Sequence, residues 1–392
     1  MVALLVGVVC DCGVTVCPRL DTFNARSTLL YAPSSRFDCF EEVAVDWLSR
    51  LFEMMPVRGR LDLRCNYGAP WRIDQGPGEA NEIPYHAVLA GSATLEDPAG
   101  GRPLQLKAGD ILLLPGNPRH VMHDGSGAAP LPARNRASLN FTISENLGSD
   151  ERLDLLCGHF AVAPPHDRLL RSYLPPLLVV HAGAHTGQQE TAAQLTGLVS
   201  LMRSESADDH LGGRAMLNAL STAMFALVMR LAGETEDAPR GLLALAGHPR
   251  LAPAVAALFN EPARAWSLPE LARLCNMSRA TLTRQFQEKL GRSASDLLTD
   301  IRMTLAANEL KKSSLSTGAV AEAVGYQSEA AFQRAFKSHM GITPAQWRKM
   351  QEPAGQDVFA RLAVLGDANP IKADAGEPTD EPRPTRGGDA PD

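Results

Sequence analysis

Two thiols and three imidazoles in the first half of the chain could carry chemistry. They belong to Cys65, Cys157, His86, His120 and His123. Two interpretations of the thiols stay open. Cys65 and Cys157 both lie in apolar segments and could simply pack there, because a free cysteine behaves as a small hydrophobic residue. Alternatively, one thiol or the pair reacts with an oxidant and serves as a redox sensor.

The three histidines could together hold a divalent metal ion such as iron, zinc or manganese, since imidazole suits several transition metals. The segment Tyr85-His86-Ala87 offers no carboxylate beside the first imidazole. His120 and His123 could instead form a polar rim on the part of the chain that contains them, if that part senses a signal. We expect no cofactor, and a metal held by His86, His120 and His123 is the alternative.

A second set of candidate residues lies in a pattern that the chain contains twice. Residues 278–286 are repeated as residues 328–336, at an offset of 50 residues. Each copy has a short apolar helix, a break, and a serine (Ser278 or Ser328) that can cap a second helix. This order is typical of a helix-turn-helix unit, so we interpret the two copies as a DNA-binding module.

Apolar residues four positions apart are expected to face inward in each copy. In the first copy, Leu282 and Phe286 should pack with Leu271 and Leu274. The residues between them are short or polar, which lets the helix approach base edges in the major groove. These outward residues are Ala280, Thr281, Thr283 and Arg284 in the first copy and Ala330, Ala331, Gln333 and Arg334 in the second.

Arginine can hold guanine with two hydrogen bonds, so Arg284 and Arg334 are the main candidates for base recognition. Other cations of this region are either phosphate neighbours or a solvated face. They are Arg302, Lys311, Lys312, Lys337, Arg348 and Lys349.

The doubled region resembles the DNA-binding domain of AraC/XylS-family transcription regulators. The resemblance rests on Ser278, Leu282, Arg284 and Phe286, then on Ala321, Val324-Gly325-Tyr326, Phe332, Arg334, Phe336-Lys337 and Gly341-Ile342-Thr343-Pro344. It implies that two recognition helices enter successive major-groove segments of double-stranded promoter DNA. It also implies contact with RNA polymerase, and activation more often than repression.

Short strand-like segments separated by Gly and Pro run from Arg60 to Ser144 and predict an antiparallel sandwich or barrel. His86 before Gly91, followed by Gly109-Asp110, Pro115 and His120, resembles the cupin fold. Further along, after residues 175–176, apolar stripes predict helices. These stripes would pack within the chain or form a homodimer interface.

The predicted fold is therefore α+β and multidomain. Its parts are an N-terminal extension (1–35), a cupin-like antiparallel β-barrel (36–165), a helical packing or dimerisation segment (166–232), a linker (233–240), an all-α double helix-turn-helix domain (241–350) and a largely disordered, acidic, Pro-rich tail (351–392).

Charge is divided unevenly along the 392 residues, whose net charge is −6. Residues 241–350 contain 14 Lys and Arg against 8 Asp and Glu, which leaves 24 against 36 for the rest. A basic module joined to an acidic body suits a DNA-binding domain attached to a domain with another task. Seven scattered cysteines and no apolar run of about 20 residues favour a cytoplasmic protein that does not enter a membrane.

Three classes of function are weighed. The first is a sequence-specific regulator whose cupin-like domain senses a small molecule or an oxidant and modulates promoter binding. The second is a metal-dependent cupin enzyme fused to a DNA-binding module. The third is a DNA-repair adaptor in which Cys10, Cys12 or Cys17 accepts alkyl groups. The cupin-like segment between those cysteines and the DNA module favours the first class, which is not an enzyme.

Overall fold

The computed structural model describes residues 46–351, apart from residues 80, 149, 165, 182–188, 235–239 and 313–314. All described residues belong to one compact unit, Val45–Asp392. The predicted N-terminal extension with Cys10, Cys12 and Cys17, most of the predicted linker and the predicted tail lie outside the described residues.

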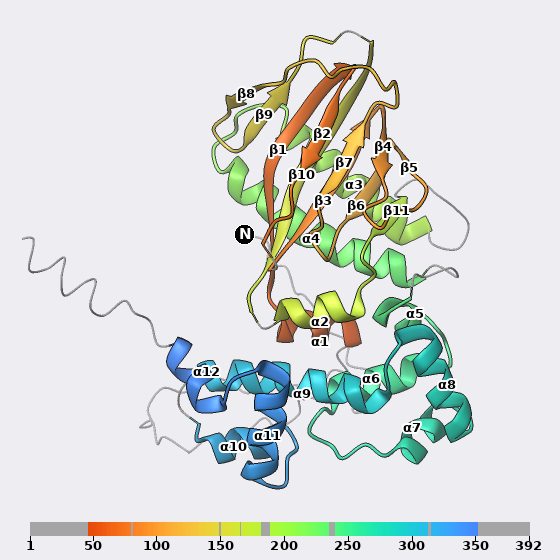
Figure 1. Cartoon of the computed structure of the whole chain (residues 1–392), viewed down its shortest axis with the longest axis vertical. Helices are drawn as coiled ribbons and strands as arrows, with labels where there is room; N and C mark the ends of the chain where they lie inside the picture. The colour runs from red at the N-terminus through yellow and green to blue at the C-terminus, as the bar shows by residue number, and fades with distance from the viewer. Residues whose placement is uncertain are drawn as a thin grey trace, which may run out of the picture. The chain divides into compact units, whose positions relative to one another are not determined.

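Two β-sheets form the N-terminal part of the described chain (Figure 1). The larger sheet has the strand order β11-β6-β3-β10-β1-β9-β8. Its strands are β1 (Val57–Ala69), β3 (Glu82–Ala90), β6 (Asp110–Leu113), β8 (Arg134–Ala137), β9 (Thr142–Glu145), β10 (Asp150–Val162) and β11 (Leu178–His181). The smaller sheet has the order β2-β7-β4-β5. Its strands are β2 (Arg72–Gln75), β4 (Ser92–Glu96), β5 (Leu104–Lys107) and β7 (His120–His123).

Neighbouring strands run antiparallel, except that β1 and β9 are parallel. One apolar core joins the two sheets. It contains Leu95 and Met122 from the smaller sheet and Leu112 and Leu155 from the larger one. Alternation along each strand sends these side chains to the same side of their sheet, and their burial drives the sheets together. The predicted cupin-like β-fold is confirmed.

The other face of the larger sheet is covered by α3 (Gln189–Glu205) and α4 (Gly213–Glu234) (Figure 1). Phe160 of β10 packs on Phe225 of α4 with 4.7 Å between ring centroids. The Tyr85 hydroxyl lies 2.8 Å from the Ser221 hydroxyl, so this buried polar pair is satisfied. The apolar stripe of α4 is therefore used largely within the chain, although Met216 is 49% exposed. Among the described helices, α4 alone has the length and composition of a membrane span, which a buried core helix also has.

Strand β11 was not predicted, because the segment after residues 175–176 was expected to be helical. It pairs with β6 in antiparallel register, and Leu178 and Val180 are buried. Its β-branched residues and the free edge of β6 explain why a strand forms at this position.

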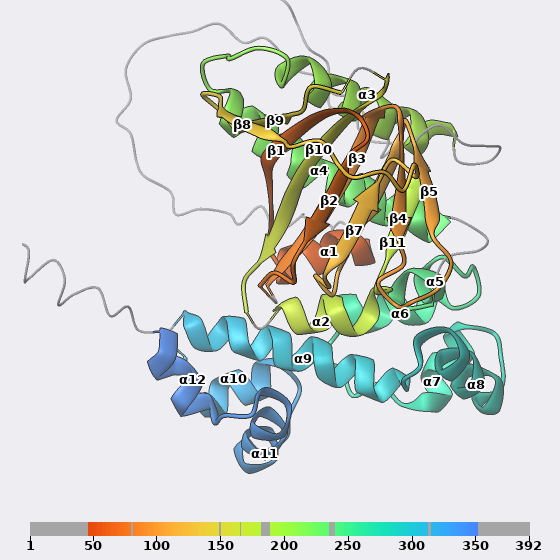
Figure 2. The same ribbon diagram turned by 45° about the horizontal axis from the view of Figure 1, so that its top comes forward.

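The C-terminal part is helical, and two short helices of the N-terminal part lie against it. These two are α1 (Trp47–Met54) and α2 (His166–Tyr173). The C-terminal helices are α5 (Leu242–Ala246), α6 (Ala252–Asn260), α7 (Leu268–Leu274), α8 (Arg279–Leu290), α9 (Ala294–Lys311), α10 (Thr317–Ala323), α11 (Glu329–Met340) and α12 (Pro344–Gln351). Figure 2 shows α9 joining the α7–α8 pair to the α10–α11 pair, with α1 and α2 beside it. The predicted double helix-turn-helix domain is confirmed.

Candidate DNA interface and thiol site

Both second helices begin at the predicted serine caps. Ser278 Oγ accepts a hydrogen bond from Thr281 N at 3.1 Å, and Ser328 Oγ accepts one from Ala331 N at 3.2 Å. Each cap satisfies a backbone N–H that the first turn of a helix leaves without a partner. The two helices also end alike, at Gly291 and Gly341 in the left-handed conformation. The local sequence therefore sets both ends of α8 and α11.

The turn before α11 requires glycine. Gly325 has a φ of +83°, and a Cβ added there would lie 2.2 Å from the carbonyl oxygen of Ala263. In the first copy Asn276 takes the left-handed conformation, with a φ of +48°. Each first helix is therefore followed by a left-handed residue, but the second turn is one residue longer, because Asn276 lies two residues before Ser278 and Gly325 lies three residues before Ser328.

Most of the predicted inward residues are buried. Leu271, Leu282 and Phe286 pack in the first copy. The prediction for Leu274 was wrong, because its side chain is 40% exposed. Helix α7 ends at Leu274, and Cys275, which is only 2% exposed, takes the inward position instead.

The predicted DNA-contacting residues lie on the outer faces of α8 and α11. Ala280, Thr283 and Arg284 of α8 are exposed, as are Ala330, Gln333 and Arg334 of α11. Thr281 and Ala331 are half-buried. The Thr281 hydroxyl also lies 2.9 Å from the Ser278 hydroxyl, so it takes part in the helix cap.

Two acidic residues that the sequence reasoning missed hold the polar readers in place. Arg284 Nε lies 3.7 Å from Glu288 Oε1, and Gln333 Nε2 donates to Glu329 Oε1 at 2.8 Å. Both pairs have the i,i+4 spacing that places side chains side by side on a helix, and this spacing could have revealed them. Among the described residues Arg334 has no ion-pair partner, so its guanidinium is the freer of the two.

Several of the other cations are committed to contacts inside the chain. Arg302 Nε donates to Pro262 O at 2.7 Å, and Arg348 donates to Leu315 O at 2.7 Å. Lys311 Nζ donates to Pro164 O at 3.0 Å. These three side chains hold loops against helices. This structural role is a third one, beside the phosphate contact and the solvated face that were expected. Lys337 is exposed on α11.

Cys65 and Cys157 meet in the core between the two sheets. They lie on the adjacent strands β1 and β10, where Leu63 pairs with Cys157 and Cys65 pairs with Leu155. The two cysteines are therefore diagonal neighbours on one face of the sheet, and each thiol is the largest influence on the pKa of the other. Both are free and buried, with Cys157 only 9% exposed.

A chain of hydrogen bonds leads away from Cys157. Its Sγ lies 3.1 Å from Nδ1 of His86, and His86 Nε2 lies 2.8 Å from His120 Nε2. His120 Nδ1 lies 3.0 Å from the carbonyl oxygen of Pro118. A carbonyl can only accept, so His120 donates from Nδ1 and, when neutral, accepts at Nε2. His86 must then donate from Nε2, which makes its Nδ1 an acceptor beside the Cys157 sulfur.

The electrostatics favour neutral imidazoles and distinguish the two thiols. Burial, assisted by the nearby His120, lowers the pKa of His86 to about 3, and burial also lowers the pKa of His120. The hydrogen bond from Cys157 lowers the pKa of Cys65, because it stabilises the Cys65 thiolate. The same hydrogen bond, together with burial, raises the pKa of Cys157 well above its ordinary value. Cys65 is therefore the more nucleophilic thiol, and Cys157 retains its proton.

Tyr67 belongs to this site and was missed from the sequence. Its hydroxyl lies 2.6 Å from the Ser144 hydroxyl and helps to lower the pKa of Cys65. The signal was its position two residues after Cys65 on the same strand, which puts both side chains on one face.

The predicted grouping of three imidazoles is wrong. His123 lies three residues beyond His120 on β7, so the two side chains leave opposite faces of the strand. His123 Nδ1 accepts from Gly125 N at 3.0 Å, and its Nε2 lies 3.8 Å from Glu96. Both ring nitrogens of His86 are already engaged by Cys157 and His120. Within the described ranges no group of three or more His, Cys, Asp or Glu residues is placed to hold a metal ion.

Two family models match the chain. The model described as Cupin matches residues 46–232, and the model described as Helix-turn-helix domain matches residues 271–350. An uncharacterised HTH-type transcriptional regulator from Haemophilus influenzae is 30% identical over 78% of this chain and 99% of its own length. The RCS-specific HTH-type transcriptional activator RclR of Escherichia coli K12 is 27% identical over 78% of this chain and 98% of its own. The HTH-type transcriptional regulator MtrA of Neisseria gonorrhoeae is 28% identical over the same shares.

These relatives are regulators with the same domain order, and they support no enzymatic role. The chain belongs to the AraC/XylS family of DNA-binding transcription regulators, with a cupin domain ahead of two helix-turn-helix units.

Proposed function

We propose that the cupin domain senses a small, uncharged oxidant through Cys65 and Cys157 and alters how α8 and α11 bind promoter DNA. The observation that carries this proposal is the contact between the two thiols, with His86 placed to accept the Cys157 proton. In this proposal the protein works in the cytoplasm as an activator and contacts RNA polymerase. The name of the relative RclR specifies an RCS signal and activation, which agrees with this direction.

The chemistry balances with hydrogen peroxide as the oxidant. The Cys65 thiolate attacks one peroxide oxygen and the O–O bond breaks, so that Cys65 becomes a sulfenic acid and hydroxide leaves. The hydroxide takes up the proton that the Cys65 thiol released when it ionised and becomes water. Cys157 Sγ then attacks Cys65 Sγ, so that an S–S bond forms and the S–O bond breaks. The Cys157 proton passes to His86 Nδ1 and leaves with the hydroxide as a second water. Burial of both thiols restricts this reaction to an oxidant that is small and uncharged.

A path from the thiols to the DNA-binding helices supports the proposal. Cys65 lies on β1, which follows α1, and Met54 O at the end of α1 accepts from Asn308 of α9 at 2.8 Å. Cys157 lies on β10, and Pro164 just beyond that strand accepts from Lys311 of α9. A disulfide would draw β1 and β10 together. Because α9 sets the separation of the two helix-turn-helix units, movement of these strand ends would change their spacing.

The outward residues of α8 and α11 are proposed to contact DNA, with Arg284, Gln333 and Arg334 as the polar base readers. A homodimer is proposed through the exposed apolar side chains of the α3–α4 region, Leu201, Leu211 and Met216. Light scattering of the full chain, with and without the target promoter, tests the dimer. A monomer under both conditions would contradict it.

The oxidant response is tested by mass spectrometry of protein treated with hydrogen peroxide, together with a promoter reporter. A peptide pair joined through Cys65 and Cys157 is expected, and Cys65→Ser and Cys157→Ser should each abolish the reporter response. Cys275→Ser is the matched control, since Cys275 is also buried but lies in the DNA-binding domain. A normal response in both cupin-domain variants would show that these thiols only pack.

A further inference from the structure

A pocket of about 280 Å³ lies beside the recognition helix of the first helix-turn-helix unit. Its walls come from the end of α6, the start of α7, the middle of α8 and the first turns of α9 (Figure 2). Its apolar lining includes Leu268, Leu271, Leu282, Phe286 and Leu298. None of the described residues that line it has an ionisable side chain. The pocket therefore offers apolar contacts and no charge.

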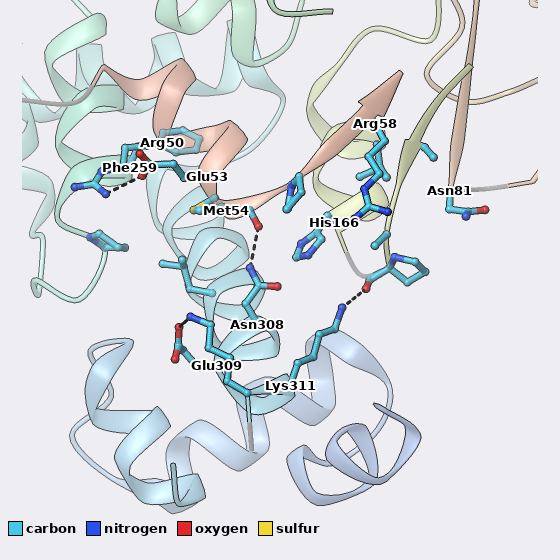
Figure 3. A pocket seen from close by; sticks show the side chains of 18 of the residues that line it. Arg50, Glu53, Met54, Arg58, Asn81, His166, Phe259, Asn308, Glu309 and Lys311 are labelled. Atoms are coloured by element: carbon cyan, nitrogen blue, oxygen red, sulfur yellow. Dashed lines mark hydrogen bonds and ion pairs between the residues drawn. The ribbon is translucent and has the colours of Figure 1, made fainter. Parts of the chain in front are cut away.

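The larger cavity between the cupin domain and α9 has the opposite character. Its volume is about 900 Å³, and Arg50, Glu53, Glu309 and Lys311 are among its charged lining residues (Figure 3). A charged group of a ligand can find an opposite charge there. Beside α8 the same group would be buried without a partner, which is costly. The pocket beside α8 therefore suits an uncharged molecule.

The second helix-turn-helix unit has larger side chains at the equivalent positions. At the offset of 50 residues Phe332 stands in place of Leu282, and both side chains are fully buried. Arg348 stands in place of Leu298, and its guanidinium donates to the carbonyl oxygen of Leu315, just before the cap of α10, at 2.7 Å. These larger groups occupy volume that the first unit leaves open. The pocket is therefore a property of the side chains of the first unit and not of the backbone pattern that both units share.

Trp266 forms a wall of the pocket that is held in place before any ligand binds. Its Nε1 donates to the carbonyl oxygen of Glu261 at 3.0 Å, and the guanidinium carbon of Arg264 lies 3.9 Å from the ring centroid. Arg264 pairs in turn with Glu261 at 3.1 Å and with Glu270 at 3.4 Å. An aromatic ligand can pack on this indole in a stacked or edge-to-face arrangement, and it loses little affinity to ordering the wall.

We propose that this pocket binds a compact, uncharged, bicyclic aromatic molecule. An apolar cavity of about 150 Å³ takes up benzene, so the larger volume of this pocket suits two fused rings. The rings pack between Trp266, Leu282 and Leu298. The hydroxyls of Thr283 and Ser295, two exposed residues of the lining, can bond to one polar atom of the ligand.

The ligand competes with DNA for Thr283. This side chain lines the pocket and is also among the residues of α8 that are proposed to contact DNA, so the competition rests on the proposed function. A ligand that engages Thr283 lowers the affinity for promoter DNA, and by linkage the promoter lowers the affinity for the ligand by the same factor. The first helix-turn-helix unit thus has a chemical input of its own, separate from the thiols of the cupin domain.

Calorimetric titration of the full chain with three probes tests the site. The probes are 2-naphthol, 2-naphthoate, which carries a charge, and phenol, which has a single ring. We expect 2-naphthol to bind about tenfold or more tightly than either of the others, because the pocket cannot neutralise a carboxylate and phenol buries less apolar surface. The proposal is overturned if 2-naphthol does not bind, or if either of the other probes binds as tightly.

Variants show whether the probe occupies this pocket. Leu282→Phe copies Phe332 of the second unit and should weaken 2-naphthol binding by about tenfold or more, because the added ring takes up pocket volume. Leu274→Phe is the matched control, since it makes the same change at an exposed residue of α7 outside the lining, and it should leave the affinity unchanged. Thermal melting shows whether the variants fold, and Leu298→Phe replaces Leu282→Phe if that variant does not. Unchanged binding in the folded pocket variant would overturn the proposal.

A second titration, with the protein bound to its promoter, tests the competition separately from the site. We expect 2-naphthol to bind the complex about fivefold or more weakly than it binds the free protein. Equal affinities would contradict the competition for Thr283. Cys65→Ser should bind 2-naphthol as the unaltered chain does, because Cys65 does not line the pocket. The ligand site and the oxidant response can therefore fail independently of each other.

Discussion

The hydroxyl of Tyr173, on α2, donates a hydrogen bond to the buried carboxylate of Asp300, on α9. The same carboxylate pairs with Arg292, which follows α8, at 3.1 Å and lies 3.3 Å from Nδ1 of His339, in α11. Arg168 of α2 also donates to the His339 carbonyl oxygen at 2.5 Å. One carboxylate thus connects the cupin-side helix α2 to the C-terminal ends of both recognition helices.

Tyr173→Phe removes one donor from a carboxylate that stays buried. We expect the free energy of unfolding to fall by about 1–3 kcal/mol, because Asp300 loses a hydrogen bond that it cannot replace with water. Thermal unfolding of the full chain measures the change. Tyr326→Phe is the matched control, because among the described residues nothing is hydrogen-bonded to the Tyr326 hydroxyl. An equal melting temperature for both variants would contradict the role given to the Tyr173–Asp300 contact.

Arg284→Ala should weaken specific promoter binding while the fold stays intact. A bidentate contact to guanine contributes about 1–3 kcal/mol of discrimination, or roughly fivefold to 150-fold in affinity. Footprinting and quantitative binding to the target promoter measure this loss. Arg273→Ala, an exposed arginine on α7, should leave the footprint unchanged. The assignment fails if Arg284→Ala binds the promoter as tightly as the unaltered protein.

Alanine substitutions at two glycines distinguish the cost of backbone strain from the cost of a steric collision. Gly291 and Gly325 both have positive φ, but only at Gly325 would a Cβ collide with another segment, the Ala263 carbonyl. Gly291→Ala should cost about 1–2 kcal/mol from the left-handed conformation alone. Gly325→Ala should cost clearly more, because the 262–264 loop must also move. Equal melting temperatures for the two variants would rule out the close approach.

Acid should destabilise the cupin domain through His86. Its pKa is lowered to about 3 in the folded chain, against an ordinary value of 6.5. Above pH 6.5 the ring is neutral in both states. As the pH falls below 6.5 the unfolded chain binds a proton that the folded chain does not, so stability is lost towards pH 3.

The slope that one such group contributes approaches about 1.4 kcal/mol per pH unit. His86→Gln should therefore show a shallower loss of unfolding free energy on acidification, whatever its stability at neutral pH. His210→Gln, which removes an exposed imidazole, serves as the control. An unchanged slope in His86→Gln would mean that His86 is not held neutral.

The sequence was sufficient to predict the two helix-turn-helix units because their signals are local. Ser278 and Ser328 cap the helices, and the four-residue spacing of Leu282 and Phe286 identifies the buried face. Only the end of α7 was misjudged, where Cys275 rather than Leu274 faces inward. A shift of one residue in the position where a helix ends is enough to bury one side chain in place of its neighbour.

The thiol site depended on long-range contacts that the sequence does not contain. Cys65, Cys157, His86 and His120 were all candidates, but the register of β1 against β10 and of β10 against β3 decides which of them meet. For the same reason the sequence could not show that His123 leaves the opposite face of β7. The Tyr173–Asp300 contact joins residues 127 positions apart, and no local pattern marks it.

The measurement that tests the central claim most directly is footprinting of the target promoter by the full chain, reduced and then treated with hydrogen peroxide. The fraction of protein with a Cys65–Cys157 disulfide is determined by mass spectrometry in the same samples. We predict that the protection at the two half-sites changes in proportion to that fraction, that dithiothreitol reverses it, and that the Cys65→Ser/Cys157→Ser double variant shows no change. An identical footprint in reduced and disulfide-bonded protein, or the same oxidant effect in the double variant, would contradict it.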